Sequence, residues 1–295
     1  MTSGALLLDK PSGHTSHDVV AIVRRLLHER RVGHAGTLDP MATGLLVVGV
    51  GPATRLLRFA QATRKVYDGT VRLGEATDSL DATGQVVARQ PVPAVTLEAI
   101  RAVALSLTGD QWQVPPMVSA VRVGGRRLYA LAREGQEVER PPRAIHVERF
   151  DVRPGAGENE WDFTVACTSG TYVRVLASDL AERIGTVGHL SALRRQSSGR
   201  LSVDDALTLD ELERQVAAGV PVVTPARTLV ASLETVTLTP DECARVRTGR
   251  PVEAAAGSDP RAALDSAGEL VAVLEPRAGS WWPSVVLAPD ARPIG

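Results

Sequence analysis

Cysteine and long apolar runs are both scarce in this chain of 295 residues, and each scarcity excludes a class of protein. The two cysteines, Cys167 and Cys243, lie far apart without a CxxC pair, which excludes a disulfide-stapled miniprotein and predicts two reduced thiols. Apolar runs such as residues 45–48 are far shorter than the ~18–20 residues of a membrane span. Asp9 and Lys10 interrupt the short apolar stretch near the N-terminus, so no signal peptide is expected. We therefore expect a soluble, cytoplasmic protein.

Charge of neither sign dominates, because 33 basic residues face 34 acidic ones and the net charge is −1. With 44% hydrophobic residues, this balance excludes a disordered chain and argues against a protein that binds a polyanion over its whole surface. The arginines are nevertheless concentrated locally. Residues 122–153 hold eight Arg against five acidic residues, whereas residues 231–295 hold six against nine. The segment 122–153 is therefore a candidate nucleic-acid contact, although such runs are more often a solvated surface.

Hydrophobic periodicity predicts alternating strands and helices, which is typical of an α/β protein. Strands are expected at residues 5–8, 45–50, 65–73, 118–123, 144–152 and 161–168. Helices are expected at 16–27 with Ser16 as N-cap, and at 96–107, 127–134, 172–184 and 208–218. Short β-like pieces follow the proline-marked connection at 220–225, namely 235–238, 262–264, 270–274 and 284–287. These patterns predict two domains, 1–228 and 229–295.

Familiar catalytic and cofactor motifs are incomplete or missing. The run GVGPAT at 49–54 lacks the third glycine of the dinucleotide fingerprint, and Pro52 removes an amide that would face a pyrophosphate. The sequence contains neither a Walker A motif nor a GxSxG elbow. His14 and His17 have no third ligand nearby in the sequence, so no metal site is predicted.

The segment 31–44 concentrates unusual residues between two regular elements. Pro40 biases Asp39 towards extended backbone, and Gly36 and Gly44 permit tight turns or the close approach of a ligand. Such a loop can hold one carboxylate against a substrate. An ordinary turn that uses Asp and Pro for their local preferences explains the pattern equally well.

A second segment, CTSGTYVR at 167–174, leads from a predicted strand into a predicted helix. Arg174 falls in the first helical turn, where the helix dipole disfavours a cation, so a specific anionic partner is expected. A surface arginine that tolerates this cost is the alternative. Tyr67 and Tyr172 are two of only three tyrosines, and scarce aromatics in such contexts suit the stacking of a base. For Tyr67, in an apolar strand, packing in the core is the alternative.

Taken together, these motifs resemble one family. The run GHAGTLDPMATG at 33–44 closely resembles the catalytic motif of the bacterial tRNA pseudouridine synthase B family, which modifies uridine-55. Further matches follow in order, namely LDKPSGHTS at 8–16, KVY at 65–67, PPMVSA at 115–120 with GRRLY at 125–129, CTSGTYVR at 167–174 and GHLSALRR at 188–195. The resemblance covers residues 4 to about 218.

The resemblance implies an isomerase that needs no cofactor and no metal. Asp39 would be the catalytic carboxylate that acts on C1′ of the target uridine, and Arg174 would pair with Asp39. Tyr67 would stack on the extruded base and help remove the C5 proton. His34 would help extract the base, Tyr172 would contact the nucleotide, and Leu193 would line the pocket.

The implied partner is the T stem-loop of tRNA, bound by a monomer with no membrane contact. The Arg-rich insertion at about 122–153 resembles the segment with which the family grips RNA. We expect its arginines to contact phosphates, namely Arg122, Arg126, Arg127, Arg133, Arg140 and Arg143. A tRNA-folding role can accompany the reaction.

The implied fold is the α/β pseudouridine synthase fold, with a mixed, largely antiparallel central sheet and a small C-terminal β-rich, PUA-like domain. Two other functions stay open at this stage. One is a tRNA-binding module without catalysis, against which the intact Asp39, Tyr67 and Arg174 argue. The other is a glycosidase, which requires a second carboxylate. The motif loop offers none, and Asp78 and Asp81 lie in a separate turn-like stretch.

Overall fold

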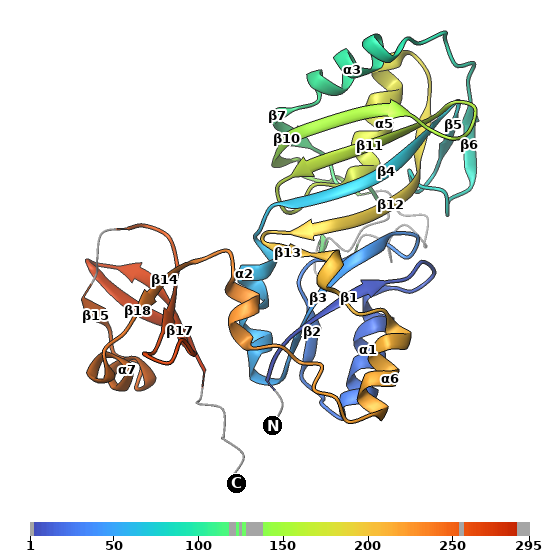
Figure 1. Ribbon diagram of the computed structural model, residues 1–295. Helices are drawn as coiled ribbons and strands as arrows, with labels where there is room; N and C mark the ends of the chain where they lie inside the picture. The colour runs from blue at the N-terminus through green and yellow to red at the C-terminus, as the bar shows by residue number, and fades with distance from the viewer. Residues whose placement is uncertain (1–2, 118–121, 124–125, 128–137, 254–256, 288–295) are drawn as a thin grey trace. The chain divides into compact units, whose positions relative to one another are not determined.

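The computed structural model describes residues 3–117, 122–123, 126–127, 138–253 and 257–287. It divides into two compact units, of which unit 1 comprises residues 1–40, 44–63 and 198–295, and unit 2 comprises residues 41–43 and 64–197. Figure 1 labels the helices and strands along the chain. Helices accompany the sheets in both units, and most strand pairs are antiparallel. The predicted α/β class with a mixed, largely antiparallel sheet is therefore confirmed. In the described part of the chain, no helix is long and apolar enough to cross a membrane.

Unit 2 is a sheet with helices packed on it. Its strands follow the order β12-β4-β11-β10-β7, and β10 pairs antiparallel with both β11 and β7. The strand bounds are β4 (Lys65–Leu73), β7 (Gly109–Gln113), β10 (Arg143–Pro154), β11 (Glu160–Cys167) and β12 (Gly188–Ser198). The helix α3 (Leu97–Ser106) packs on β10, and α5 (Val173–Ile184) packs on β4 and α3. Two small hairpins complete the unit, β5 (Glu75–Thr77) with β6 (Val86–Arg89), and β8 (Arg122–Val123) with β9 (Arg126–Arg127).

The N-terminal part of unit 1 is built around β3 (Thr43–Val50), which pairs antiparallel with β1 (Gly4–Lys10) and β2 (Val32–His34). Leu6, Leu8, Leu46 and Val48 point from β1 and β3 into a buried cluster with α1 (Ser16–Leu27) and α6 (Leu209–Ala217). Shorter elements complete this part, namely the 3-10 helices η1 (Gly51–Leu56), η2 (Val203–Asp205) and η3 (Ala226–Val230), α2 (Leu57–Gln61) and β13 (Leu201–Ser202).

The C-terminal part of unit 1 is the β-rich region that the sequence predicts. Its five-stranded sheet has the order β14-β16-β17-β18-β15 and one parallel pair, β14 with β16. The bounds are β14 (Glu234–Thr237), β15 (Val252–Glu253), β16 (Arg261–Leu264), β17 (Leu270–Arg277) and β18 (Ser280–Val286). The helix α7 (Pro240–Arg247) contributes the buried Cys243 and Val246 to the core of this sheet. Both cysteines of the chain are free and buried.

Most predicted elements are present within one or two residues of their expected ends, and the expected strand at 65–73 coincides with β4. One prediction is wrong, because the N-cap of α1 is Thr15 and not Ser16. Thr15 accepts a hydrogen bond from the Asp18 amide, and the Asp18 carboxylate accepts one from the Thr15 amide, which forms a capping box. The predicted helix at 127–134 and most of the predicted strand at 118–123 lie outside the described residues. The division at residue 228 stays a prediction.

Candidate active site

The loop that carries Asp39 connects β2 and β3 in unit 1. Gly36 and Gly44 have φ angles of +93° and +96°, so both glycines occupy the left-handed region that glycine adopts without strain. Asp39 is half-buried and follows Leu38, whose side chain is only 3% exposed. The loop is therefore anchored in the core immediately before the candidate carboxylate.

Ser16 fixes the backbone on the N-terminal side of Asp39. Its hydroxyl accepts a hydrogen bond from the amide of Leu38 at 2.9 Å and donates one to the carbonyl of Leu38 at 3.0 Å. Ser16 is fully buried, and its hydroxyl satisfies both polar groups of one loop residue. Thus the first residue of α1 holds the peptide units that flank Leu38.

Lys10 fixes the backbone on the C-terminal side of Asp39. Its ammonium group is completely buried and donates to the carbonyls of Pro11 at 2.9 Å, His14 at 2.7 Å and Pro40 at 3.3 Å. The Pro40 carbonyl also accepts a hydrogen bond from the amide of Gly13 at 2.9 Å. Because a buried charge is costly unless its donors are used, these contacts explain why a lysine is tolerated at this position.

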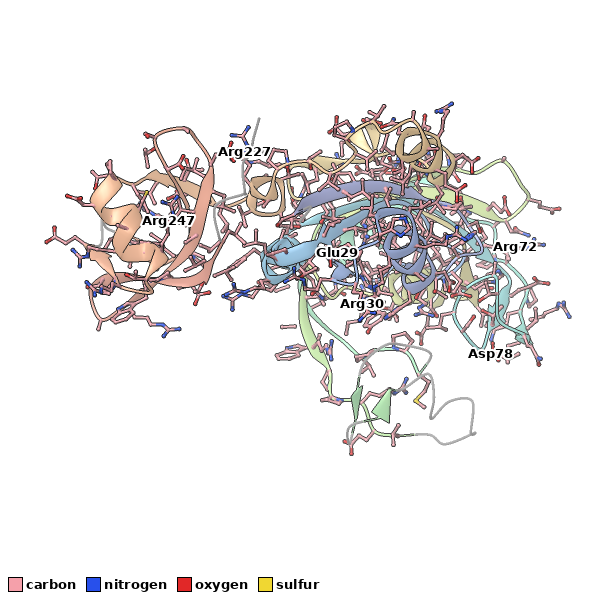
Figure 2. All side chains as sticks on the ribbon, turned by 90° about the horizontal axis from the view of Figure 1, so that it is seen from below. Glu29, Arg30, Arg72, Asp78, Arg227 and Arg247 are labelled. Atoms are coloured by element: carbon pink, nitrogen blue, oxygen red, sulfur yellow. The ribbon has the colours of Figure 1, made fainter. Side chains whose placement is uncertain are left out.

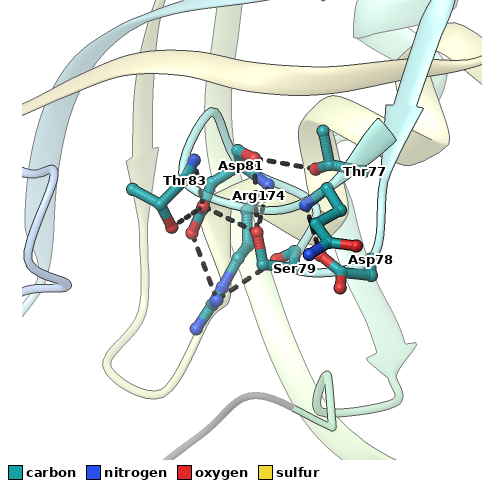
Figure 3. Close-up of polar contacts among 7 residues, drawn as sticks. Thr77, Asp78, Ser79, Asp81, Thr83 and Arg174 are labelled. Carbon is teal, nitrogen blue, oxygen red and sulfur yellow. Dashed lines mark hydrogen bonds and ion pairs between the residues drawn. The ribbon is translucent and has the colours of Figure 1, made fainter. Parts of the chain in front are cut away.

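Arg174 lies in unit 2, in the first turn of α5, and its side chain is 4% exposed. Figure 3 shows the guanidinium reaching the loop between β5 and β6, where Nη1 lies 3.4 Å from Oδ2 of Asp81 and donates to the carbonyl of Ser79 at 3.2 Å. The anionic partner that the sequence analysis expected for this arginine is thus present in unit 2 as Asp81. The pairing of Arg174 with Asp39 stays a prediction.

The loop around Asp81 is a dense set of short polar side chains. Oδ1 of Asp81 accepts from the hydroxyl of Ser79 at 2.7 Å, and from the amide and hydroxyl of Thr83 at 3.0 and 2.6 Å. The hydroxyl of Thr77 donates to the carbonyl of Asp81 at 2.7 Å (Figure 3). Asp81 is 3% exposed, and these hydrogen bonds fix the orientation of its carboxylate independently of its contact with Arg174. Asp78, in the same loop, instead accepts a hydrogen bond from the Gln85 amide at 2.9 Å. Asp78 is one of the residues labelled in Figure 2.

Tyr67 and Lys65 lie on β4, two positions apart and therefore on one face of the strand. Tyr67 is 8% exposed and Lys65 is 4% exposed. Burial, with a smaller contribution from the nearby charge of Arg195, lowers the pKa of Lys65 to about 8. The neighbouring Cys167, which is opposite Lys65 in the β4–β11 register, has its pKa raised to about 11 by burial.

The other predicted site residues are distributed over several elements. His34 ends β2 in unit 1, where its ring meets the ring of His17 edge to face at 5.5 Å. In unit 2, Tyr172 is the N-cap of α5 and Leu193 lies in β12, and both are half-buried. Unit 2 thus contains four of the predicted site residues, Tyr67, Tyr172, Arg174 and Leu193.

The predicted phosphate contacts are only partly described. Arg122 lies in β8, and Arg126 and Arg127 form β9. Arg143 begins β10 and is exposed, whereas Arg140 donates to the carbonyl of Pro115 at 3.1 Å. Arg133 lies outside the described residues.

Sequence reasoning missed three residues that hold the candidate site, namely Ser16, Lys10 and Asp81. The sequence analysis predicts Ser16 as the N-cap of the helix at 16–27 and places Asp81 in a turn-like stretch separate from the motif loop. The signal that could have identified Asp81 is the concentration of Thr, Ser and Asp at 77–83, since short polar side chains of this kind organise backbone turns.

Sequence comparison gives the family. The N-terminal domain of the TruB family of pseudouridylate synthases matches residues 24–173. The tRNA pseudouridylate synthase B C-terminal domain matches residues 174–236, and the C-terminal region of tRNA pseudouridine synthase II matches residues 233–288. The chain belongs to the TruB family.

Full-length relatives agree with this assignment. The tRNA pseudouridine synthase B of Arthrobacter sp. (strain FB24) is 45% identical, covering 100% of this chain and 100% of the relative. The tRNA pseudouridine synthase B of Thermobifida fusca (strain YX) is also 45% identical, covering 98% of this chain and 99% of the relative. These TruB relatives confirm the enzyme class predicted from the motifs, a tRNA pseudouridine synthase B, which is an isomerase.

Solved structures share the fold. A chain in the crystal structure of a Cbf5–Nop10–Gar1 complex matches with a TM-score of 0.76 and 25% identity, over 97% of this chain and 85% of that chain. A chain of an H/ACA RNP bound to a substrate RNA containing 2′-deoxyuridine matches with a TM-score of 0.74 and 23% identity, over 98% of this chain and 86% of that chain. The predicted pseudouridine synthase fold of this TruB member is therefore confirmed.

Proposed function

We propose that this TruB member converts uridine-55 in the T-arm of tRNA to pseudouridine, with Asp39 as the catalytic carboxylate. The observation that carries the proposal is the Asp39 loop, whose backbone is held by Ser16 at Leu38 and by Lys10 at Pro40. A carboxylate on a loop fixed at both neighbours is suited to a reaction that requires one accurately placed group.

The proposed reaction keeps all atoms of the uridine. Asp39 acts on C1′, the bond between N1 and C1′ breaks, and the uracil turns until C5 bonds to C1′. C5 then loses its proton, and N1 gains one, so the product is an isomer of unchanged mass. Tyr67 lies beside the base as a stacking partner and assists the removal of the C5 proton.

Unit 2 supplies the charge that complements Asp39 in this proposal. In the proposed reaction Arg174 pairs with Asp39, and within unit 2 the guanidinium is bound by Asp81. His34 assists the extraction of the base, and Tyr172 and Leu193 contact the nucleotide. Extrusion of a base costs a few kcal/mol, and stacking on an aromatic ring returns about 1–3 kcal/mol of that cost.

The tRNA contacts are proposed on the segment 122–153, through the arginines at 122, 126, 127, 133, 140 and 143. Phosphate contacts of this type supply affinity and orientation without sequence readout. We further infer that a monomer acts in the cytoplasm without cofactor or metal, that residues 229–295 form a PUA-like domain, and that a tRNA-folding role accompanies catalysis.

A glycosidase is the competing function, and the geometry of Asp81 argues against it. A hydrolase needs a second carboxylate that can exchange a proton or activate water. Oδ1 of Asp81 already accepts from Ser79 and Thr83, and Oδ2 faces Arg174, so this buried carboxylate is committed to structure.

Product analysis on a tRNA transcript separates the possible functions. The proposal predicts pseudouridine at position 55, detected as an isomer of uridine with unchanged mass. Release of free uracil would show a glycosidase, and binding without any product would show a module that lacks catalysis. Either of these two results would overturn the proposed reaction.

A further inference from the structure

The edge strand β7 of unit 2 has two very different faces. Trp112 is 73% exposed, whereas its neighbour Gln113 is 5% exposed, because successive side chains of a strand point to opposite faces. A buried glutamine amide loses its contacts with water and must find hydrogen-bond partners within the protein. The partners of Gln113 therefore indicate why a polar residue occupies this position.

Gln113 uses both ends of its amide on one residue. Its Oε1 accepts a hydrogen bond from the amide of Tyr172 at 2.7 Å, and its Nε2 donates to the carbonyl of Tyr172 at 3.1 Å. A backbone amide can only donate and a carbonyl can only accept, so this pattern fixes the orientation of the glutamine amide. The two bonds hold the peptide groups on both sides of the Tyr172 Cα.

Tyr172 is the residue from which α5 begins. It is the N-cap of α5, it makes no side-chain capping bond, and its carbonyl accepts the helical bonds from Val175 and Leu176 at 3.1 and 3.3 Å. The chain reaches this position through Gly170, which has a φ of +88°. Gln113 thus holds the backbone of the N-cap residue from a distant strand, at a helix start whose N-cap side chain makes no capping bond.

Because Arg174 is only two residues beyond Tyr172, the start of α5 also sets the position of the guanidinium next to Asp81. We propose that Gln113 is a positioning residue for pseudouridine formation, since it holds the turn from which Tyr172 and Arg174 project. This inference rests on the proposed function, in which both of these side chains belong to the site. A displacement of about 1 Å at a reacting group can cost about 100-fold in rate.

The test measures single-turnover pseudouridine formation and tRNA affinity for Gln113→Met, which keeps the length of the side chain and removes both bonds. Gln111→Met is the matched control, because Gln111 lies on the same face of β7 but donates to the carbonyl of Leu107, at the end of α3, at 2.6 Å. We expect Gln113→Met to lower the rate about 10- to 100-fold with tRNA affinity within threefold. Gln111→Met should keep its rate within twofold of wild type.

Gln113→Glu gives a second readout that a merely structural role would not produce. A protonated carboxyl can still donate to the Tyr172 carbonyl, whereas a carboxylate faces that oxygen with a like partial charge. Because position 113 is 5% exposed, burial should raise the pKa of a glutamate introduced there, so the rate of Gln113→Glu relative to wild type should rise severalfold as the pH falls from 8 to 5. If Gln113→Met does not fold, the pH dependence of Gln113→Glu alone tests the positioning role of Gln113.

Three results would overturn the positioning role: a near-wild-type rate for Gln113→Met, an equal loss in Gln111→Met, or a pH-independent ratio for Gln113→Glu. A wild-type chain that forms no pseudouridine would instead overturn the proposed function, and the positioning role with it. The two failures are therefore distinguishable in one set of assays.

Discussion

The Asp39 loop in unit 1 and the Arg174 turn in unit 2 are held by different sets of contacts. Around Asp39, side chains hold the backbone, because Ser16 hydrogen-bonds to the backbone of Leu38 and Lys10 donates to the carbonyl of Pro40. At Arg174, the protein fixes the side chain itself, through Asp81 and the carbonyl of Ser79. Both regions are thus held through their backbone, at Leu38 and Pro40 in one and at Tyr172 in the other, and the guanidinium of Arg174 is in addition bound directly by Asp81.

This difference fits the roles proposed for the two groups. A group that acts on the substrate must be delivered to one position and still take part in chemistry, so restraint on its backbone is appropriate. A charge that only complements the reacting group can be bound permanently, because electrostatic preorganisation requires no rearrangement during the reaction. The chain has only two lysines, and both are buried: Lys10, which contacts the Asp39 loop, and Lys65, which lies on β4 two positions from Tyr67.

Within unit 2, the largest effect is expected at Tyr67. Tyr67→Leu removes both the aromatic face and the hydroxyl, so turnover should fall at least about 100-fold and tRNA binding should weaken. Tyr67→Phe keeps the face, so binding should survive while turnover falls. Rates and affinities measured with tRNA transcript check both variants. Equal, near-wild-type rates for the two would show that Tyr67 is only a core residue.

Asp81 tests whether Arg174 depends on its permanent partner. Asp81→Asn keeps the shape of the side chain but removes its charge, and it should lower turnover about 10- to 100-fold because the guanidinium loses its orientation. The free energy of unfolding should fall by about 3–5 kcal/mol, as expected when a buried pair loses one charge. Asp78→Asn in the same loop is the control and should leave turnover within twofold. Unchanged turnover in Asp81→Asn would remove Asp81 from the account.

Ser16 tests the other half of the comparison, the restraint on the backbone. Ser16→Ala leaves the amide and carbonyl of the buried Leu38 without the hydroxyl, so we expect a loss of about 1–3 kcal/mol of stability and about tenfold in turnover. Thr208→Ala removes the capping box of α6 and should cost about 1 kcal/mol with little change in turnover. Thermal unfolding and single-turnover rates measure both effects. Equal activity losses in the two variants would mean that Ser16 acts through stability alone.

The smallest predicted effect concerns the pH dependence of stability at Lys65. Its pKa is about 8 in the folded chain and 10.5 ordinarily, so between these values the unfolded chain binds more protons and stability rises with pH. Relative to Lys65→Met, which cannot titrate, the wild type should gain roughly 1 kcal/mol between pH 8 and pH 9. Denaturant unfolding at several pH values checks this difference. A constant difference between the two proteins would contradict the low pKa.

Local patterns made most of the fold predictable, and long-range contacts account for what was missed. The apolar periodicity of β4 and the cap at Thr96 of α3 are readable from neighbouring residues. The helix α7 was missed because it is largely polar, although Thr239 and Glu242 form a capping box at its start. Asp81 and Arg174 are 93 positions apart, so their pairing depends on the tertiary fold and has no local signature.

The candidate site follows the same division. The backbone preferences of Gly36, Pro40 and Gly44 make Asp39 a candidate, and the resemblance of residues 33–44 to the family motif selects it. The hydrogen bonds between Ser16 and Leu38 join residues 22 positions apart, and those between Gln113 and Tyr172 join residues 59 positions apart. Neither contact could be derived from the spacing of residues in the sequence. Sequence patterns therefore select the candidates for catalysis, whereas the long-range contacts that hold their backbone become visible only in the folded chain.

The most direct test of the central claim is the single-turnover rate and tRNA affinity of Asp39→Asn. The side chain keeps its size but cannot act as a carboxylate, so pseudouridine formation should fall below about 1% of wild type. Affinity for tRNA should stay within about tenfold, because phosphate contacts elsewhere supply most of the binding. Residual turnover clearly above 1% of wild type in a folded Asp39→Asn protein would contradict the assignment of Asp39 as the catalytic carboxylate.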